Sequence, residues 1–205
     1  MIRERIRADA GLFERVRLAA FLGDAAAHLA LGTEAPRPAD TPSGLANGLE
    51  TWGHECSVRA GYAAGRIVLP LWEQRPLHVM PLTPHSPTQK LELVGAWIAC
   101  PCERHLEDAR EGLEHFASGS RAEIEGPTTW ALAHDVVDRV LGNVVRPHGK
   151  AGRRLEDAIT WAAEAMAANR RSPGALAISG DLEAGFGVIR SAIQHDLVAW
   201  ALPAK

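Results

Sequence analysis

The repetition of apolar residues at helical spacing between Leu49 and Ala99 most strongly constrains the fold of this chain. The first run carries Trp52, Cys56, Ala60, Ala63 and Ile67, and the second carries Leu91, Val94, Trp97 and Ile98. Residues three and four positions apart lie on one face of a helix. A Pro-containing segment, Leu69-Pro70-Leu71-Trp72-Glu73, separates the two runs. The sequence therefore predicts two buried helices, residues 49–69 and 88–99, joined by a rigid elbow and serving as a hub for other helices.

Similar apolar stripes recur over residues 2–31, 102–117, 127–145, 155–168 and 181–201. No stretch alternates apolar and polar residues as a half-buried strand would. The expected fold is a single all-α domain over residues 1–205, a bundle or irregular array of about seven to eight helices without a significant sheet. Two Pro- and Gly-rich loops are expected, at residues 32–48 and 70–87. Gly23-Asp24 predicts a helix end followed by a new N-cap, whereas Thr88 and Asp181 are expected to cap later helices.

Composition narrows the class of protein. Apolar residues make up 46% of the 205 residues and charged residues 23%, which is typical of a globular chain rather than a disordered one. The net charge of −3 lacks the basic excess of nucleic-acid binders. No stretch approaches the roughly 20 apolar residues that span a bilayer, and the charged residues 1–7 precede no signal-peptide core. We therefore expect a bacterial cytoplasmic protein that binds neither nucleic acid nor membrane.

The cysteines and two of the histidines predict the sharpest chemical site. His54 and Cys56 lie near the start of the first hub helix, and Cys100, Cys102 and His105 lie at a helix junction. Cysteine and histidine are the usual zinc ligands, so these five residues are candidate metal ligands. The C-x-C spacing differs from the C-x(2–4)-C knuckles of structural zinc sites. The alternative is that Cys56 belongs to the core, that Cys100 and Cys102 are half-exposed thiols, and that the chain has no cofactor.

The sequence contains no recognisable catalytic constellation. Nine histidines are scattered over helices and loops, and none lies at a recognisable spacing from a nucleophile and an acid. We expect each to be solvated, including His134, which with Asp135 lies beside an apolar stripe. Gly149-Lys150 lacks the remaining residues of a phosphate-binding loop. An enzymatic role is therefore not the favoured interpretation.

A polar face on the first hub helix is the candidate surface for a partner. Glu55, Arg59 and Arg66 fall at spacings of four and seven, and with Glu50, five residues before Glu55, they are expected to share roughly one face opposite Trp52. Trp72 and Glu73 in the elbow extend the candidate surface. The alternative is an ordinary solvated face with ion pairs.

The elbow and the helix after it carry a family resemblance. At Leu69-Pro70-Leu71-Trp72-Glu73, followed by Pro87, Leu91-Glu92 and Ala96-Trp97, the chain resembles a family of small, Ala-rich, all-helical bacterial immunity proteins. The matching segments cover about a quarter of the chain. The family pattern has an acidic Arg-Pro loop where this chain has Pro84-His85-Ser86-Pro87, and small Ala residues where it has Val94-Gly95. The resemblance implies an all-α bundle and, through the family label, neutralisation of a toxin.

These observations favour a non-enzymatic protein-binding module, of an immunity or defence type, that neutralises or scaffolds a partner protein. The partner would be a toxin or a subunit of a larger assembly. The alternative is a metal-binding or small-ligand-binding protein, or an enzyme, with an interhelical His/Cys pocket. Metal content and capture of a partner would separate the two hypotheses.

Overall fold

A computed structural model describes residues 9–32, 40–79, 84–114, 128–145, 151–169 and 179–202. Within these ranges the chain forms nine helices and no strand, which confirms the predicted all-α class and shows that the expected count of seven to eight was slightly low. The helices are α2 (Ala10–Phe21), α3 (Ala25–Leu31), α4 (Pro42–Glu50), α5 (His54–Glu73), α6 (Pro87–Ala99), α7 (Glu103–Glu114), α9 (Thr129–Val145), α10 (Ala151–Asn169) and α11 (Ser179–Ala201). None of these helices is both long and apolar enough to cross a bilayer.

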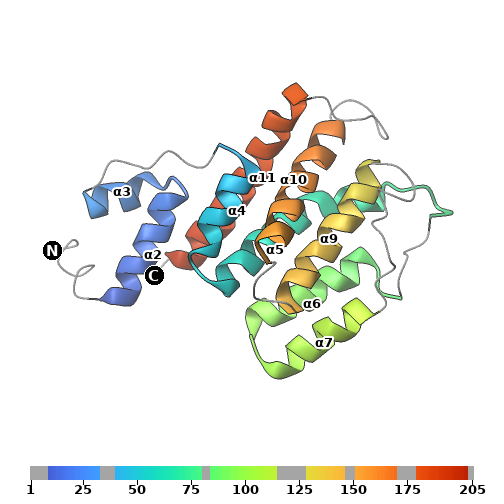
Figure 1. Cartoon of the computed structure of the whole chain (residues 1–205), viewed down its shortest axis with the longest axis horizontal. Coiled ribbons are helices and arrows are strands. Elements are labelled where there is room, and N and C mark those ends of the chain that lie inside the picture. The colour runs from blue at the N-terminus through green and yellow to red at the C-terminus, as the bar shows by residue number, and fades with distance from the viewer. Residues whose placement is uncertain are drawn as a thin grey trace.

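Helix α5 is the centre of the molecule, as predicted for the first hub helix, whereas the second predicted hub helix, α6, lies at one end of the central group. Helix α5 packs against α9, α10 and α11, which also pack against one another in sequence order, and it contacts α4 and α6 (Figure 1). Its interior glycines permit these close approaches. A Cβ on Gly61 would meet Val140 of α9 at 3.3 Å, and a Cβ on Gly65 would meet Leu91 of α6 at 2.9 Å. Close packing of α5 against α9 and α6 therefore accounts for both glycines.

The remaining helices lie at two ends of this central group. Helices α6 and α7 pack together against α9, whereas α2 packs against α3 and α11 at the other end (Figure 1). The predicted break between the first two helices is confirmed. Gly23 has a φ of 92°, and the Asp24 carboxylate accepts a hydrogen bond from the backbone N–H of Ala27. Gly32, with a φ of 69°, then ends α3.

The boundaries predicted around the hub were wrong in two places. Part of the segment expected to be a loop at 32–48 is helical, because Thr41 caps α4 and Pro42 occupies its first turn, where a missing N–H costs nothing. Burial of Leu45 and Leu49 then holds α4 on the core. Glu50 consequently ends α4 and does not belong to the hub helix, which begins only at His54.

The expected break at the Leu69–Glu73 elbow was also wrong, because α5 continues through Pro70 to Glu73. Proline removes one backbone hydrogen bond from a helix interior. The last turn is nevertheless held in place because Leu71 and Trp72 are buried, at 4% and 1% exposure. Pro70 itself is exposed. Tertiary packing thus overrides the local helix-breaking signal, and the connection between the two hub helices starts after Glu73.

Three predicted helix starts were also displaced. Ser86 caps α6 through a capping box with Gln89, with Pro87 in the first turn, so Thr88 is not the cap. Helix α10 begins at Ala151, four residues before the apolar stripe that predicted it at residues 155–168. Helix α11 begins at Ser179, which places Asp181 in the first turn.

Candidate functional site

An open pocket of about 870 Å³ lies between α5 and α11. Small and apolar side chains line most of it, and polar groups lie at its edge. The lining residues are Ala63, Arg66, Ile67, Ala184, Gly187, Val188, Ser191, Ala192, His195 and Asp196. We refer to this feature as the α5/α11 pocket. Its small side chains would allow the backbone of another segment to come close to α5 and α11.

Two glycines of α11 differ sharply in what surrounds them. A Cβ on Gly185 would lie 2.2 Å from the backbone oxygen of Ala163, so close packing of α11 on α10 explains this glycine. A Cβ on Gly187 would meet nothing within 4 Å. Glycine in a helix interior is about 1 kcal/mol less favourable than alanine. Packing within the described part of the chain therefore does not explain Gly187, which lines the α5/α11 pocket.

Charges of both signs lie at the edge of the pocket. Arg66 of α5 lies 3.7 Å from the carboxylate of Asp196 on α11, and both side chains are partly exposed. The Arg66 guanidinium also lies 5.8 Å from the centre of the Tyr62 ring. His195 is 85% exposed, and its Nδ1 lies 3.3 Å from Asp196. Exposed ion pairs contribute little to folding, so these charges are available to contact a partner.

The structure does not gather the predicted partner residues on one face. Arg59 pairs with Glu55 at 2.9 Å and lies over the Trp200 ring at 4.7 Å. Arg59 also donates a hydrogen bond to the backbone oxygen of Ile98. Arg59 thus joins α5 to α6 and α11. Among the six predicted partner residues, only Arg66 lines the α5/α11 pocket.

The other three predicted partner residues lie in different environments. Glu50 is half-buried on α4, where burial and the carboxylate of Glu156 raise the pKa of Glu50 above its ordinary value of 4.5. Trp72 is buried beside Trp130, with Arg75 over its ring at 4.2 Å. The exposed Glu73 accepts a hydrogen bond from the hydroxyl of Thr88 at 3.1 Å, which ties the end of α5 to α6.

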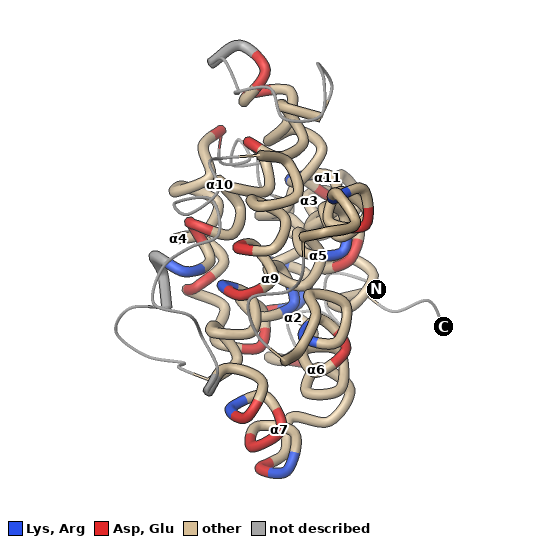
Figure 2. Tube along the Cα trace, turned by 90° about the vertical axis from the view of Figure 1, so that its right-hand side faces the viewer, with Lys and Arg blue, Asp and Glu red and all other residues tan. Residues whose placement is uncertain are grey.

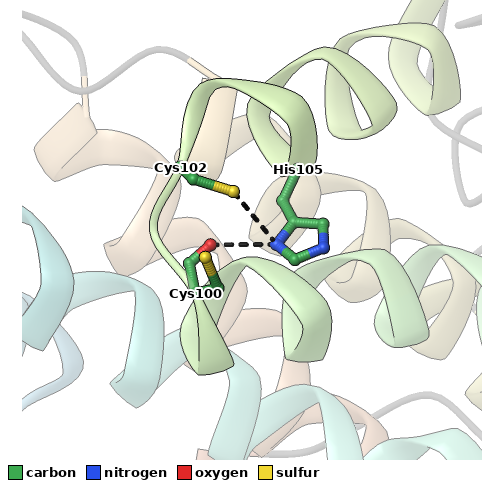
Figure 3. A group of neighbouring side chains, drawn as sticks. All are labelled: Cys100, Cys102 and His105. Atoms are coloured by element: carbon green, nitrogen blue, oxygen red, sulfur yellow. Dashed lines mark hydrogen bonds between the residues drawn. The ribbon is translucent and has the colours of Figure 1, made fainter.

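Three of the five predicted metal ligands come together at the junction of α6 and α7 (Figure 3). Cys100 follows α6, Cys102 precedes α7, and His105 lies in the first turn of α7. One potential ligand atom from each residue lies within 4.8 Å of the other two. The His105 Nδ1 is 3.5 Å from the Cys102 Sγ and 2.9 Å from the Cys100 backbone oxygen. We refer to these three residues as the Cys/His cluster.

Hydrogen bonds at the start of α7 favour the thiolate form of Cys102. The backbone N–H of His105, the Cys100 side chain and the backbone N–H of Arg104 lower the pKa of the Cys102 thiol. The hydrogen bond from Cys100 to Cys102 raises the pKa of the Cys100 thiol in turn. Because thiolates are the form of cysteine that binds metals, this arrangement suits a soft cation.

His54 and Cys56 do not join the cluster. The His54 Nε2 is 3.3 Å from the backbone oxygen of Val144, and its ring packs edge-on against Trp97 at 5.2 Å. Cys56 is fully buried, and burial raises the pKa of its thiol to about 12. Cys56 therefore behaves as a core residue, in keeping with the alternative considered for it.

The interior of the bundle also contains a polar group that the sequence interpretation missed. Lys90 of α6 is fully buried, and its Nζ lies 2.5 Å from the carboxylate of Asp138 on α9. The other Asp138 oxygen is 3.7 Å from His134 Nδ1, which is also 3.5 Å from the Asp135 carboxylate. His134 is 1% exposed and packs on Trp72, so the expectation of a solvated His134 was wrong. Helix α9 is enclosed on nearly every side, which buries polar positions that a single apolar stripe would leave outside.

Elsewhere in the described part of the chain, Figure 2 shows acidic and basic residues interspersed rather than gathered by sign. Acidic and basic residues alternate along α7, for example in the pair between Glu103 and Arg110 (Figure 2). No family model matches the chain, and neither a curated protein nor a solved structure shows significant similarity to it. The functional argument therefore depends on the geometry of the α5/α11 pocket and the Cys/His cluster.

Proposed function

We propose that this chain is a protein-binding module that receives an amphipathic helix of a different protein in the α5/α11 pocket. The observation that carries the proposal is Gly187, an interior helix glycine that lines the pocket and that no contact among the described residues explains. A bound backbone lying against α11 would account for the absence of a side chain there. The glycine at position 187 would then lower the stability of the free chain while allowing the partner to approach α11 closely.

The surroundings of the pocket define the chemistry of the partner helix. Two long helices flank the pocket, and helices pack by fitting the side-chain ridges of one into the grooves of another. Ala63, Ile67 and Val188 would contact an apolar face. Arg66 and Asp196 would pair with acidic and basic residues at the borders of that face, where charges favour the correct partner more than they add affinity.

The family resemblance supports a toxin as the kind of partner, because members of that family are regarded as immunity proteins. Neutralisation would then follow from occupying a surface that the toxin needs. This role requires no catalytic residues in the chain. It rests on the resemblance of residues 69–97 and is separate from the argument for the pocket.

The test compares three forms of the chain as bait in a lysate of the source organism, with quantitative mass spectrometry. Ser191→Trp places a large side chain in the pocket, whereas Glu107→Trp places the same side chain on the exposed surface of α7. We expect one protein to be retained by the wild type and by Glu107→Trp, and to be lost from Ser191→Trp. Equal retention by all three forms would refute the pocket as the binding surface.

A second substitution separates binding from folding. Gly187→Ala should raise the free energy of unfolding by about 0.5–1 kcal/mol, because alanine favours the helix and its Cβ meets nothing. The same change should weaken the complex with the captured partner, measured by isothermal titration calorimetry. A Gly187→Ala variant that is more stable and binds the partner with unchanged affinity would contradict the role given to Gly187.

The mass of the free chain in solution is a further check, because a dimer dissociated by Ser191→Trp would show that the pocket binds a second copy instead.

A further inference from the structure

The structure assigns a metal site to the Cys/His cluster, in which Cys100, Cys102 and His105 bind one zinc ion through two thiolates and an imidazole nitrogen. This inference is independent of the proposed protein-binding role, because the cluster lies between α6 and α7 and none of its residues lines the α5/α11 pocket. The set of donors is characteristic of zinc, which combines cysteine sulfur with histidine nitrogen.

The distances already approach those of a tetrahedral site. Zinc–sulfur bonds of about 2.3 Å and zinc–nitrogen bonds of about 2.0–2.1 Å place neighbouring S and N ligands about 3.5–3.6 Å apart. The Cys102 Sγ and His105 Nδ1 are 3.5 Å apart. The Cys100 ligand atom lies within 4.8 Å of both. A rotation of the exposed Cys100 side chain would bring it to the spacing of about 3.8 Å that two tetrahedral thiolates require.

The hydrogen bonds of the cluster are compatible with replacement of a proton by a metal. A carbonyl oxygen can only accept, so the Nδ1 of His105 carries the proton in its contact with the Cys100 oxygen. The ion would bind at Nδ1 after this proton moves to Nε2. The Cys100 oxygen would keep a donor, because it also accepts from the backbone N–H of Cys102 at 2.7 Å. Metal binding therefore leaves the Cys100 carbonyl oxygen with a hydrogen-bond donor.

The backbone also holds the ligands in place before a metal binds. Cys102 and His105 are three residues apart across the first turn of α7, so both side chains lie on one side of the helix start. Cys102 directly precedes α7, and the positive end of the helix dipole would share the charge of a bound thiolate. Three protein ligands leave a fourth position for water or an added ligand, which is the coordination of an open rather than a closed zinc site.

The experiment is a titration of the purified, reduced, full-length chain with Co²⁺ and then with Zn²⁺. Cobalt in a tetrahedral thiolate site gives visible d–d bands and a near-ultraviolet band from sulfur-to-metal charge transfer. We expect both at one equivalent, followed by their loss when zinc displaces cobalt. Cys100→Ser and Cys102→Ser should each lose about half of the charge-transfer intensity, because one of the two thiolates is removed. His105→Ala should retain that band but bind the ion at least about tenfold more weakly.

Cys56→Ala is the matched control, because it removes the third thiol, which is buried and lies outside the cluster. It should leave the cobalt spectrum and the zinc stoichiometry unchanged. Far-ultraviolet circular dichroism checks the folding of each variant. An absence of thiolate bands in the folded wild type would overturn the assignment. Charge-transfer bands of undiminished intensity in both Cys100→Ser and Cys102→Ser would do the same. If the variants of the Cys/His cluster lose zinc binding but still capture the partner, the metal site and the α5/α11 pocket act independently.

Discussion

The buried pair of Lys90 and Asp138 should be the most sensitive polar contact in the fold. It joins α6 to α9 at a place that water does not reach, with side-chain exposures of 0% and 7%. Lys90→Met keeps the length of the side chain and removes its charge. The substitution leaves the carboxylate of Asp138 buried without its cation. We expect Lys90→Met to lower the free energy of unfolding by about 3–5 kcal/mol, which is the usual cost of breaking one partner of a buried ion pair.

The double variant should recover much of this loss. Lys90→Met with Asp138→Leu replaces the pair by apolar side chains, and such replacements are often neutral or stabilising. His134 remains beside Asp135 in that variant, so some polar contact persists. We expect a coupling energy of about 2 kcal/mol or more between positions 90 and 138, well above the error of additivity of about 0.5 kcal/mol.

The assay is urea unfolding of the wild type, both single variants and the double variant, followed by tryptophan fluorescence and circular dichroism. The exposed pair of Arg17 and Glu14, at 2.9 Å and about half exposed, provides the control cycle. Its coupling should not exceed about 0.5 kcal/mol. A loss below about 1 kcal/mol in Lys90→Met, with coupling no larger than in the control pair, would refute this account of the interior.

Two further predictions follow from particular contacts. Glu50 binds its proton more tightly in the folded chain than in the unfolded chain, so it opposes folding increasingly as the pH rises from about 4 through its raised pKa. Glu50→Gln should therefore stabilise the chain at pH 7 and have little effect on its stability at pH 4. Urea unfolding at both pH values measures this difference. An equal change in the free energy of unfolding at the two pH values would contradict the prediction. Gly185→Ala should destabilise by about 1–3 kcal/mol, because its Cβ would press on the Ala163 backbone of α10, and a thermal melt showing no loss would contradict that contact.

The helical class of the fold was predictable because apolar spacing of three and four is a local property of the sequence. The boundary between α2 and α3 was predictable for a similar reason, since Gly23 and Asp24 act within one turn. The end of α5 was not, because Pro70 signals a break locally while the burial of Leu71 and Trp72 keeps the turn helical. Long-range packing decided that boundary.

The Cys/His cluster was partly predictable because its three residues are close in sequence. The α5/α11 pocket was not, since it forms between helices more than 100 residues apart in the chain. The signal available for it was Gly187, but Gly185 lies two residues away and looks the same in sequence. Only the structure shows that α10 explains one glycine and leaves the other open. The burial of Lys90 and His134 likewise depends on how α9 is enclosed by its neighbours.

The most direct test of the protein-binding proposal is site-specific photo-crosslinking in cells of the source organism. A photoreactive phenylalanine derivative would replace Ser191 in the pocket or, as a control, Glu107 on α7. The account predicts one covalent adduct with a different protein from position 191, absent from position 107 and abolished by a competing excess of chain with an unmodified pocket. No adduct at position 191, or the same adducts from both positions, would contradict the assignment of the α5/α11 pocket as the partner-binding surface.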